Sequence, residues 1–133
     1  MNMNANVDKL LAAISSGTGS AVGDLYADDA VLDATVPGWR FSRRGGSAIA
    51  AEYAGWYADP GRFEELDRVE VPDGEIVTFL LAWEERGVPH AAHQCHQLGI
   101  DPSTGRISSD RAFCGGRWDA TLLASMEAAE HAH

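Results

Sequence analysis

Four long strand-like segments follow one another in the second half of the chain, and they restrict the fold more than any other feature. They span residues 62–71, 75–86, 88–100 and 106–114. Short connections rich in Gly, Pro and Asp separate them. Strands joined by such turns pair antiparallel, so this half of the chain predicts an antiparallel meander.

Helical patterns fill the first half of the chain. Apolar residues at helical spacing predict a helix over Val7–Ser16, a second short helix around Ala21–Tyr26 and a third whose N-cap is Ser47. A strand is expected at Ala30–Val36 and a closing helix at Trp118–Ala129. Helices followed by a meander predict an α+β fold, and residues 1–133 suit one domain with a hydrophobic core.

The net charge restricts the possible partners. Twenty acidic residues against ten basic ones give a formal net charge of −10, which repels nucleic acid and anionic membranes, so neither is expected as a partner. Three arginines, Arg40, Arg43 and Arg44, form a small basic cluster that we interpret as a solvated loop.

Compartment signals favour the cytoplasm. The polar start of the chain lacks the layout of a signal peptide, and no apolar run approaches the roughly 20 residues of a membrane span. The two cysteines, Cys95 and Cys114, are predicted on opposite faces of the sheet, which makes a disulfide improbable. We therefore expect a cytoplasmic protein in a reducing setting.

The last two strand segments form a hairpin that brings polar side chains together. Centring its turn on Ser103 places His96 opposite Asp110. The same register places Gln94 opposite residue 112 and residue 92 opposite Cys114. Because side chains alternate along a strand, Gln94, His96, Asp110 and Cys114 then share one face. Groups able to move protons on one face predict a proton-transfer site, although a one-residue slip would separate them.

Three local segments resemble the nuclear transport factor 2-like superfamily, which includes ketosteroid isomerases and SnoaL-type polyketide cyclases. They are residues 25–32 (LYADDAVL), 45–53 (GGSAIAAEY) and 105–107 (GRI). The resemblance covers about residues 7–115. It implies a cone-shaped α+β fold, with three N-terminal helices packed on a curved mixed, mostly antiparallel sheet and a C-terminal helix.

The same resemblance implies a pocket between helices and sheet. Phe79, Leu81 and Trp83 would line it from one strand. The next two strands would contribute Gln94, His96 and Leu98, and then Asp110, Ala112 and Cys114. An aromatic wall for a planar ligand would consist of Tyr26, Trp39, Tyr53, Trp56 and Trp83.

Members of the superfamily differ in the polar residues of this pocket. Where ketosteroid isomerases carry a basic carboxylate this chain has Ala34, and where they carry an oxyanion tyrosine it has Leu10, which disfavours steroid isomerisation. Only Asp110 matches the limonene epoxide hydrolase pattern. SnoaL-type cyclases carry a glutamine and a histidine two apart and an aspartate on the next strand, as Gln94, His96 and Asp110 stand here.

The sequence therefore predicts a small SnoaL-like enzyme that catalyses acid–base proton transfer, an aldol-type cyclisation or isomerisation, on a polyketide-like or aromatic carbonyl compound. Asp110 would be the acid–base residue, His96 would orient it or stabilise an enolate, and Gln94 would hold a substrate oxygen. A dehydratase or hydrolase on the same scaffold is one alternative. A non-catalytic dimeric module that binds a small hydrophobic ligand is another.

Two further expectations concern metal binding and assembly. His90, His93 and His96 suggest a metal site, but on a strand His93 points away from the other two, so we expect neither metal nor other cofactor. Residues 76–83 are almost wholly apolar, so both faces of that strand need cover. Family members commonly pair through the sheet face away from the helices, and we expect a homodimer through that face.

Overall fold

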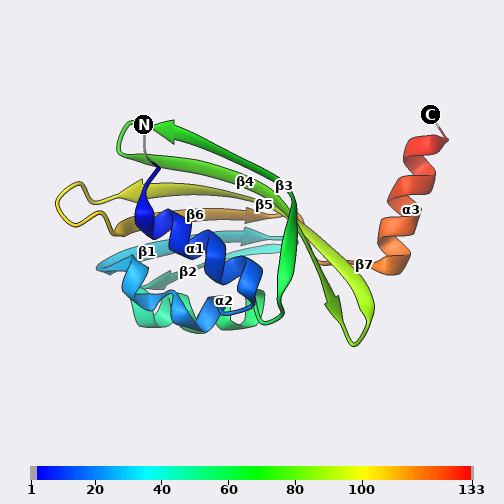
Figure 1. The fold of residues 1–133 in the computed structure, drawn as a ribbon, viewed down its shortest axis with the longest axis horizontal. Coiled ribbons are helices and arrows are strands. Elements are labelled where there is room, and N and C mark those ends of the chain that lie inside the picture. Colours follow the sequence, from blue (N-terminus) through cyan, green and yellow to red (C-terminus); the bar gives the residue numbers. More distant parts are fainter. Residues whose placement is uncertain (1–2, 133) are drawn as a thin grey trace.

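A curved seven-stranded sheet forms the frame of this computed structural model, which describes residues 3–132 (Figure 1). Met1, Asn2 and His133 lie outside the described residues. Six strands follow the order β2-β1-β6-β5-β4-β3, and β7 pairs with β5. The parallel pair is β1 with β6, and the other pairs are antiparallel. The strands are β1 (Tyr26–Val36), β2 (Trp39–Arg44), β3 (Gly61–Val71), β4 (Gly74–Glu85), β5 (Val88–Ile100), β6 (Ile107–Cys114) and β7 (Trp118–Asp119).

Two helices cover one face of this sheet, and a third extends from its end (Figure 1). The first, α1 (Ala5–Ser16), packs beside β3, and α2 (Gly46–Trp56) packs beside β1 and β2. The third, α3 (Ala120–His131), follows β7 and projects away from the body. The α+β class and the meander β3–β6 are as predicted. None of the helices in residues 3–132 is long and apolar enough to cross a membrane.

The predicted second helix is wrong. Two 3₁₀ turns, η1 (Gly19–Ala21) and η2 (Gly23–Leu25), take its place, and Tyr26 already belongs to β1. The chain lies directly against α2 here, because a Cβ on Gly19 would come within 2.0 Å of the Tyr53 carbonyl oxygen. The Gly19 amide donates to the Tyr57 carbonyl at 3.2 Å, which fixes the end of α2.

Two smaller predictions are also corrected. Gly45 rather than Ser47 is the N-cap of α2, and no cap bond from a side chain accompanies it. The arginine cluster lies on strand β2 rather than in a loop, since β2 pairs with the second half of β1 through a tight turn at 37–38. Arg40 and Arg43 there face the carboxylates of Asp33 and Glu52.

The register of the β5–β6 hairpin differs by two residues from the predicted one. His96 lies opposite Ala112, and Leu98 opposite Asp110. Two causes add up: the turn closes between Asp101 and Arg106, and a bulge leaves Ser108 without a partner. Because the total shift is even beyond the bulge, Gln94, His96, Asp110 and Cys114 stay on their predicted face. Ile107, on the turn side of the bulge, was predicted on the outer face and is instead fully buried in the core.

The core lies between the helices and the inner face of the sheet. Val7, Leu10 and Ile14 of α1 and Ile49 of α2 are fully buried there, against alternate residues of β4. The opposite face of β4, from Ile76 to Ala82, is only half-buried. We expected both faces of this strand to be covered. Within the chain only the inner face is.

A buried ion pair holds the open edge of the sheet to α1. Glu75, 2% exposed, accepts two hydrogen bonds from Arg68, from Nε at 2.9 Å and from Nη2 at 3.1 Å. Arg68 also reaches Asp8 of α1 at 2.6 Å. A bidentate pair of this kind satisfies both charges away from water, and it ties β3, β4 and α1 together.

We expect Arg68→Met to destabilise the fold by about 3 kcal/mol, because it leaves the buried Glu75 carboxylate without its cation. Urea unfolding followed by tryptophan fluorescence measures the change. Arg40→Met, which breaks the exposed pair with Asp33, is the matched control and should leave the unfolding midpoint unchanged. Equal effects of the two substitutions would contradict a special role for the buried pair.

Candidate functional site

Asp110 is the centre of a cluster of hydrogen bonds buried between the sheet and the helices. Its Oδ2 atom accepts from the hydroxyls of Tyr26, at 2.7 Å, and Tyr53, at 2.6 Å. Its Oδ1 atom lies 2.8 Å from Nδ1 of His96. None of these four side chains is more than 2% exposed. The carboxylate is therefore held by groups from β1, α2 and β5.

The cluster continues from the far side of the imidazole. Nε2 of His96 lies 3.0 Å from Oε1 of Gln94 and 3.2 Å from the hydroxyl of Tyr57, and this hydroxyl also donates to Gln94 Oε1. Gln94 and Tyr57 are buried as well. We call these six residues, Tyr26, Tyr53, Tyr57, Gln94, His96 and Asp110, the buried network. Within residues 3–132 every fully buried side-chain nitrogen or oxygen has a partner.

Local structure explains why these side chains meet. Gln94 and His96 are two apart on β5, so they share the inner face, as does Asp110 on β6. Tyr53 and Tyr57 are four apart at the end of α2, so both face the sheet. The ring of Phe79 stacks on His96, with centroids 5.6 Å apart, and fixes the plane of the imidazole.

Charge and burial determine which groups are donors. Burial raises the pKa of Asp110, but the positive charge of His96 and the hydrogen bonds from His96, Tyr53 and Tyr26 outweigh it, and the pKa is lowered overall. Burial, followed by the charge of Asp110, raises the pKa of all three network tyrosines well above the usual value. Asp110 is thus an ionised acceptor and the tyrosines are neutral donors.

Hydrogen-bond complementarity also assigns the protons of His96. Its two ring nitrogens face oxygen acceptors, Oδ1 of Asp110 and Oε1 of Gln94. Both nitrogens therefore carry a hydrogen in this arrangement, which makes His96 an imidazolium paired with the Asp110 carboxylate. With the Gln94 amide reversed, its NH₂ group would donate to a neutral imidazole instead.

A cavity of about 360 Å³ lies next to this network, at the end of α2. Gln94 belongs to both, and the thiol of Cys114, 3.6 Å from Gln94 Nε2, lies beside it. The indole rings of Trp56 and Trp83 form much of the wall. The other lining residues are Val36, Pro37, Gly55, Leu81, Ala92, Gly116 and Arg117. We call this space the inner cavity.

The predicted site residues separate into three groups. Gln94, Trp56, Trp83 and Cys114 line the inner cavity. Asp110, His96, Tyr26 and Tyr53 lie in the network behind it, and Phe79 packs on His96. Trp39 does not belong to the aromatic wall: it lies on β2, 71% exposed, beside a separate hollow with Phe41 and Trp56.

Sequence reasoning missed Tyr57 and Arg117. Tyr57 was detectable, because it follows Tyr53 by one helical turn and its ring must face the same side. Arg117 follows two glycines outside any predicted element, and nothing in the sequence places it at the inner cavity. The histidines considered for a metal site diverge, with His93 exposed on the outer face and His96 buried on the inner one.

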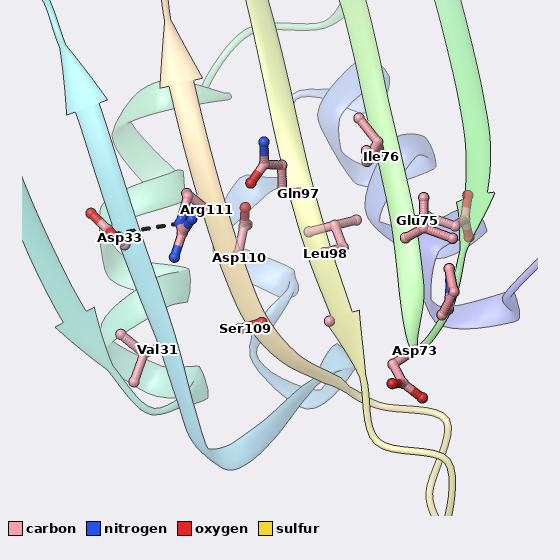
Figure 2. A pocket seen from close by; sticks show the side chains of 13 residues that line it. Val31, Asp33, Asp73, Glu75, Ile76, Gln97, Leu98, Ser109, Asp110 and Arg111 are labelled. Atoms are coloured by element: carbon pink, nitrogen blue, oxygen red, sulfur yellow. Dashed lines mark ion pairs between the residues drawn. The ribbon is translucent and has the colours of Figure 1, made fainter.

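A second hollow, of about 730 Å³, lies on the outer face of the sheet (Figure 2). Ile76 of β4, Gln97 of β5 and Arg111 of β6 border it, and Asp33 of β1 pairs with Arg111 at 3.9 Å. Asp110 also borders this hollow, but its carboxylate is fully buried and makes its hydrogen bonds on the opposite, inner side of the sheet. The outer hollow is therefore separate from the buried network.

Solved structures share this architecture. A hypothetical protein from Catenulispora acidiphila with a ketosteroid isomerase-like fold, solved with trimethylamine, is 17% identical, with a TM-score of 0.63 over 86% of this chain and 88% of its own. A putative isomerase from Bacillus subtilis is also 17% identical, with a TM-score of 0.66 over 83% of this chain and 84% of its own.

The epoxide hydrolase/cyclase-like enzyme SalBIII, with a role in pyran ring formation in the polyether salinomycin, is 15% identical. It aligns with a TM-score of 0.61 over 83% of this chain and 88% of its own. No protein-family model and no curated protein sequence matches the chain. These likenesses confirm the predicted resemblance at the level of fold alone: the chain shares its fold with these structures, one of which is described as ketosteroid isomerase-like.

The buried network predicts a specific loss of stability in acid. Because the pKa of Asp110 is lower in the folded protein than in the unfolded chain, its ionisation stabilises the fold above about pH 4, and this contribution is lost as the pH falls through the folded value. Thermal unfolding between pH 6 and pH 2.5 should show a steeper acid-side fall for the wild type than for Asp110→Asn. Parallel curves would contradict the assignment of an ionised Asp110.

Proposed function

We propose that the protein is a small acid–base enzyme of the SnoaL-like kind, acting on a polyketide-like or aromatic carbonyl compound bound in the inner cavity. The reaction would be an aldol-type cyclisation or an isomerisation that begins with removal of a proton next to the carbonyl group. One observation carries the proposal: the line of hydrogen bonds from Asp110 through His96 to Gln94 ends at the cavity wall.

The geometry favours His96 over Asp110 as the group that moves the proton. Both oxygens of Asp110 are occupied by donors behind the imidazole, whereas Nε2 of His96 points toward Gln94 and the cavity. The imidazolium described above would first release its Nε2 hydrogen as Gln94 turns aside, and the neutral His96 would then take the substrate proton on Nε2, with the Asp110 carboxylate stabilising the imidazolium that re-forms. This reverses the roles that the sequence suggested.

Gln94 would act on the substrate oxygen. The Gln94 NH₂ group faces the thiol of Cys114, a weak acceptor, so it can donate to an enolate oxygen instead. For a carbon acid to reach His96, the Gln94 side chain must turn aside, since it lies between the imidazole and the cavity. Catalytic contacts are often looser in a free enzyme and tighten when substrate binds.

The cavity wall supports the substrate class. Two indole rings and several apolar side chains suit a planar, largely apolar molecule, and a volume of about 360 Å³ lies within the usual range for small-molecule sites. The likeness to SalBIII and to a putative isomerase, at 15–17% identity, bears on the fold alone, and this fold hosts many reactions, so the cavity wall and the buried network carry the proposal.

A second candidate is a module that binds a small hydrophobic ligand without catalysis. The observation that favours it is that neither Asp110 nor His96 lines the inner cavity. In that case the buried network would hold α2 on the sheet, and only the aromatic wall would serve the ligand.

Deuterium exchange separates the two candidates without knowledge of the natural substrate. In D₂O, the wild type should accelerate exchange at the carbon next to the carbonyl group of 2-tetralone, followed by NMR. Asp110→Asn and His96→Leu should each lower the protein-dependent rate at least about 100-fold, normalised to the folded fraction measured by circular dichroism. Asp29→Asn, on the exposed start of β1, is the control and should not change the rate.

A substitution at the inner cavity, outside the buried network, tests the same proposal without destabilising the fold. Gly55 is exposed at the edge of the inner cavity and a Cβ on it meets no atom within 4 Å, so Gly55→Leu adds bulk at the cavity edge without a clash and replaces a poor helix former in α2. It should abolish the exchange while the melting temperature is kept or raised. Quenching of tryptophan fluorescence by 2-tetralone without any exchange would support the binding module instead.

We also propose that the outer face of the sheet pairs with a second copy. Phe113 on this face is 40% exposed, and the face borders a hollow of about 730 Å³. The outer face mixes apolar Ile76 and Phe113 with polar Gln97 and Arg111, a composition common in interfaces.

Sedimentation equilibrium at micromolar concentration should give about twice the chain mass of 14.2 kDa. Phe113→Glu on the outer face should shift the protein to the monomer. Val88→Glu is the matched control, because Val88 is similarly exposed, at 44% against 40%, but lies at the β4–β5 turn. A wild-type mass near that of one chain would refute the dimer.

A further inference from the structure

Arg117 and Glu85, two charged residues at the inner cavity, have no role in the proposed proton transfer. Arg117 lines the cavity, with its guanidinium 5.5 Å from the ring centre of Trp83, and forms an ion pair with Glu85. The indole Nε1 of Trp83 donates to Oε1 of the same glutamate at 3.0 Å. Two groups of the cavity wall thus already bind one carboxylate together.

The backbone keeps Arg117 at this place. Strand β7 pairs with β5, so residues 115–117 must cross directly from β6 to that pairing. Gly116 has a φ of 122°, and a Cβ there would lie 3.3 Å from Pro37 Cγ and 3.5 Å from Trp118 Nε1. A residue with a side chain is therefore strained at position 116. The backbone of Arg117 is therefore held at the rim of the inner cavity, and its guanidinium side chain is 61% exposed there.

An anionic ligand in the inner cavity needs a cation such as Arg117 more than it would in most proteins. The chain carries a net charge of −10, so its overall field repels anionic ligands, and the remaining wall of the inner cavity is largely apolar. A carboxylate in that setting requires a paired cation and hydrogen-bond donors. Arg117 and the Trp83 indole supply both.

We propose that the inner cavity takes a planar aromatic carboxylate. Its carboxylate would bind Arg117 and Trp83 Nε1 in the place of Glu85, and its ring would lie against the indoles of Trp56 and Trp83. Glu85 is 32% exposed at the end of β4 and also lies 3.8 Å from His90 Nε2, so it can turn outward and keep a partner. The inference rests on the proposed function insofar as both use the same cavity.

Matched probes test the carboxylate directly. Naphthalene-2-carboxylate and naphthalene-2-carboxamide have the same ring and differ in charge, and both can be titrated by tryptophan fluorescence. Arg117→Gln should weaken carboxylate binding about 5- to 10-fold and leave the carboxamide unchanged. Glu85→Gln should tighten carboxylate binding several-fold, because it removes the competing anion. Glu84→Gln, with the same change of net charge on the next residue, should alter neither.

The outcomes distinguish this inference from the proposed function. Equal binding of the two probes, with neither changed by Arg117→Gln, would overturn the carboxylate assignment and leave the cavity as a ligand site. Absence of binding by both probes, with 2-tetralone exchange intact, would overturn it as well. If the wild type neither binds the two probes nor accelerates 2-tetralone exchange, the inner cavity is not a ligand site.

Discussion

The buried negative charge of Asp110 is the constraint on which the rest of this structure depends. A carboxylate without exposure is tolerated only when donors replace the water that it has lost, and here three donors do so. Tyr26 comes from the start of β1, Tyr53 from α2 and His96 from β5. Each must be in place at once, so the charge specifies how α2 lies on the sheet.

This requirement extends to parts of the chain that carry no polar group of the network. Tyr53 and Tyr57 reach their partners only if the end of α2 lies close to β5 and β6. The 3₁₀ turns before β1 hold that end, because Gly19 packs against the backbone of Tyr53 and donates to Tyr57. A regular second helix would carry side chains into this contact. The close contact of Gly19 with the end of α2 therefore explains both why the predicted second helix does not form and how the tyrosines of the site are held.

The sequence was sufficient to predict which face of the sheet the polar site residues occupy, but not which residues they contact there. Alternation along β5 and β6 placed Gln94, His96 and Asp110 on one side, and that result survived a two-residue error in register because the error was even. The error came from closure of the turn between Asp101 and Arg106 and from a bulge at Ser108, both of which depend on tertiary packing. The contact of Asp110 with Tyr26 and Tyr53 joins residues 84 and 57 positions apart, and no local pattern encodes such distances.

Gln94 separates two kinds of residue with different tolerance to change. Behind it, each group of the buried network satisfies another, so a substitution there leaves an unpaired buried group and lowers stability. In front of it, Trp56, Cys114 and Arg117 border the inner cavity and are not fully buried, so substitution there costs the fold less, whereas Trp83, 7% exposed, also belongs to the core. Structures only 15–17% identical share this fold, so the fold tolerates change at most positions. In the proposed function, substrate identity would then be determined by the few side chains in front of Gln94, and the proton chemistry by those behind it.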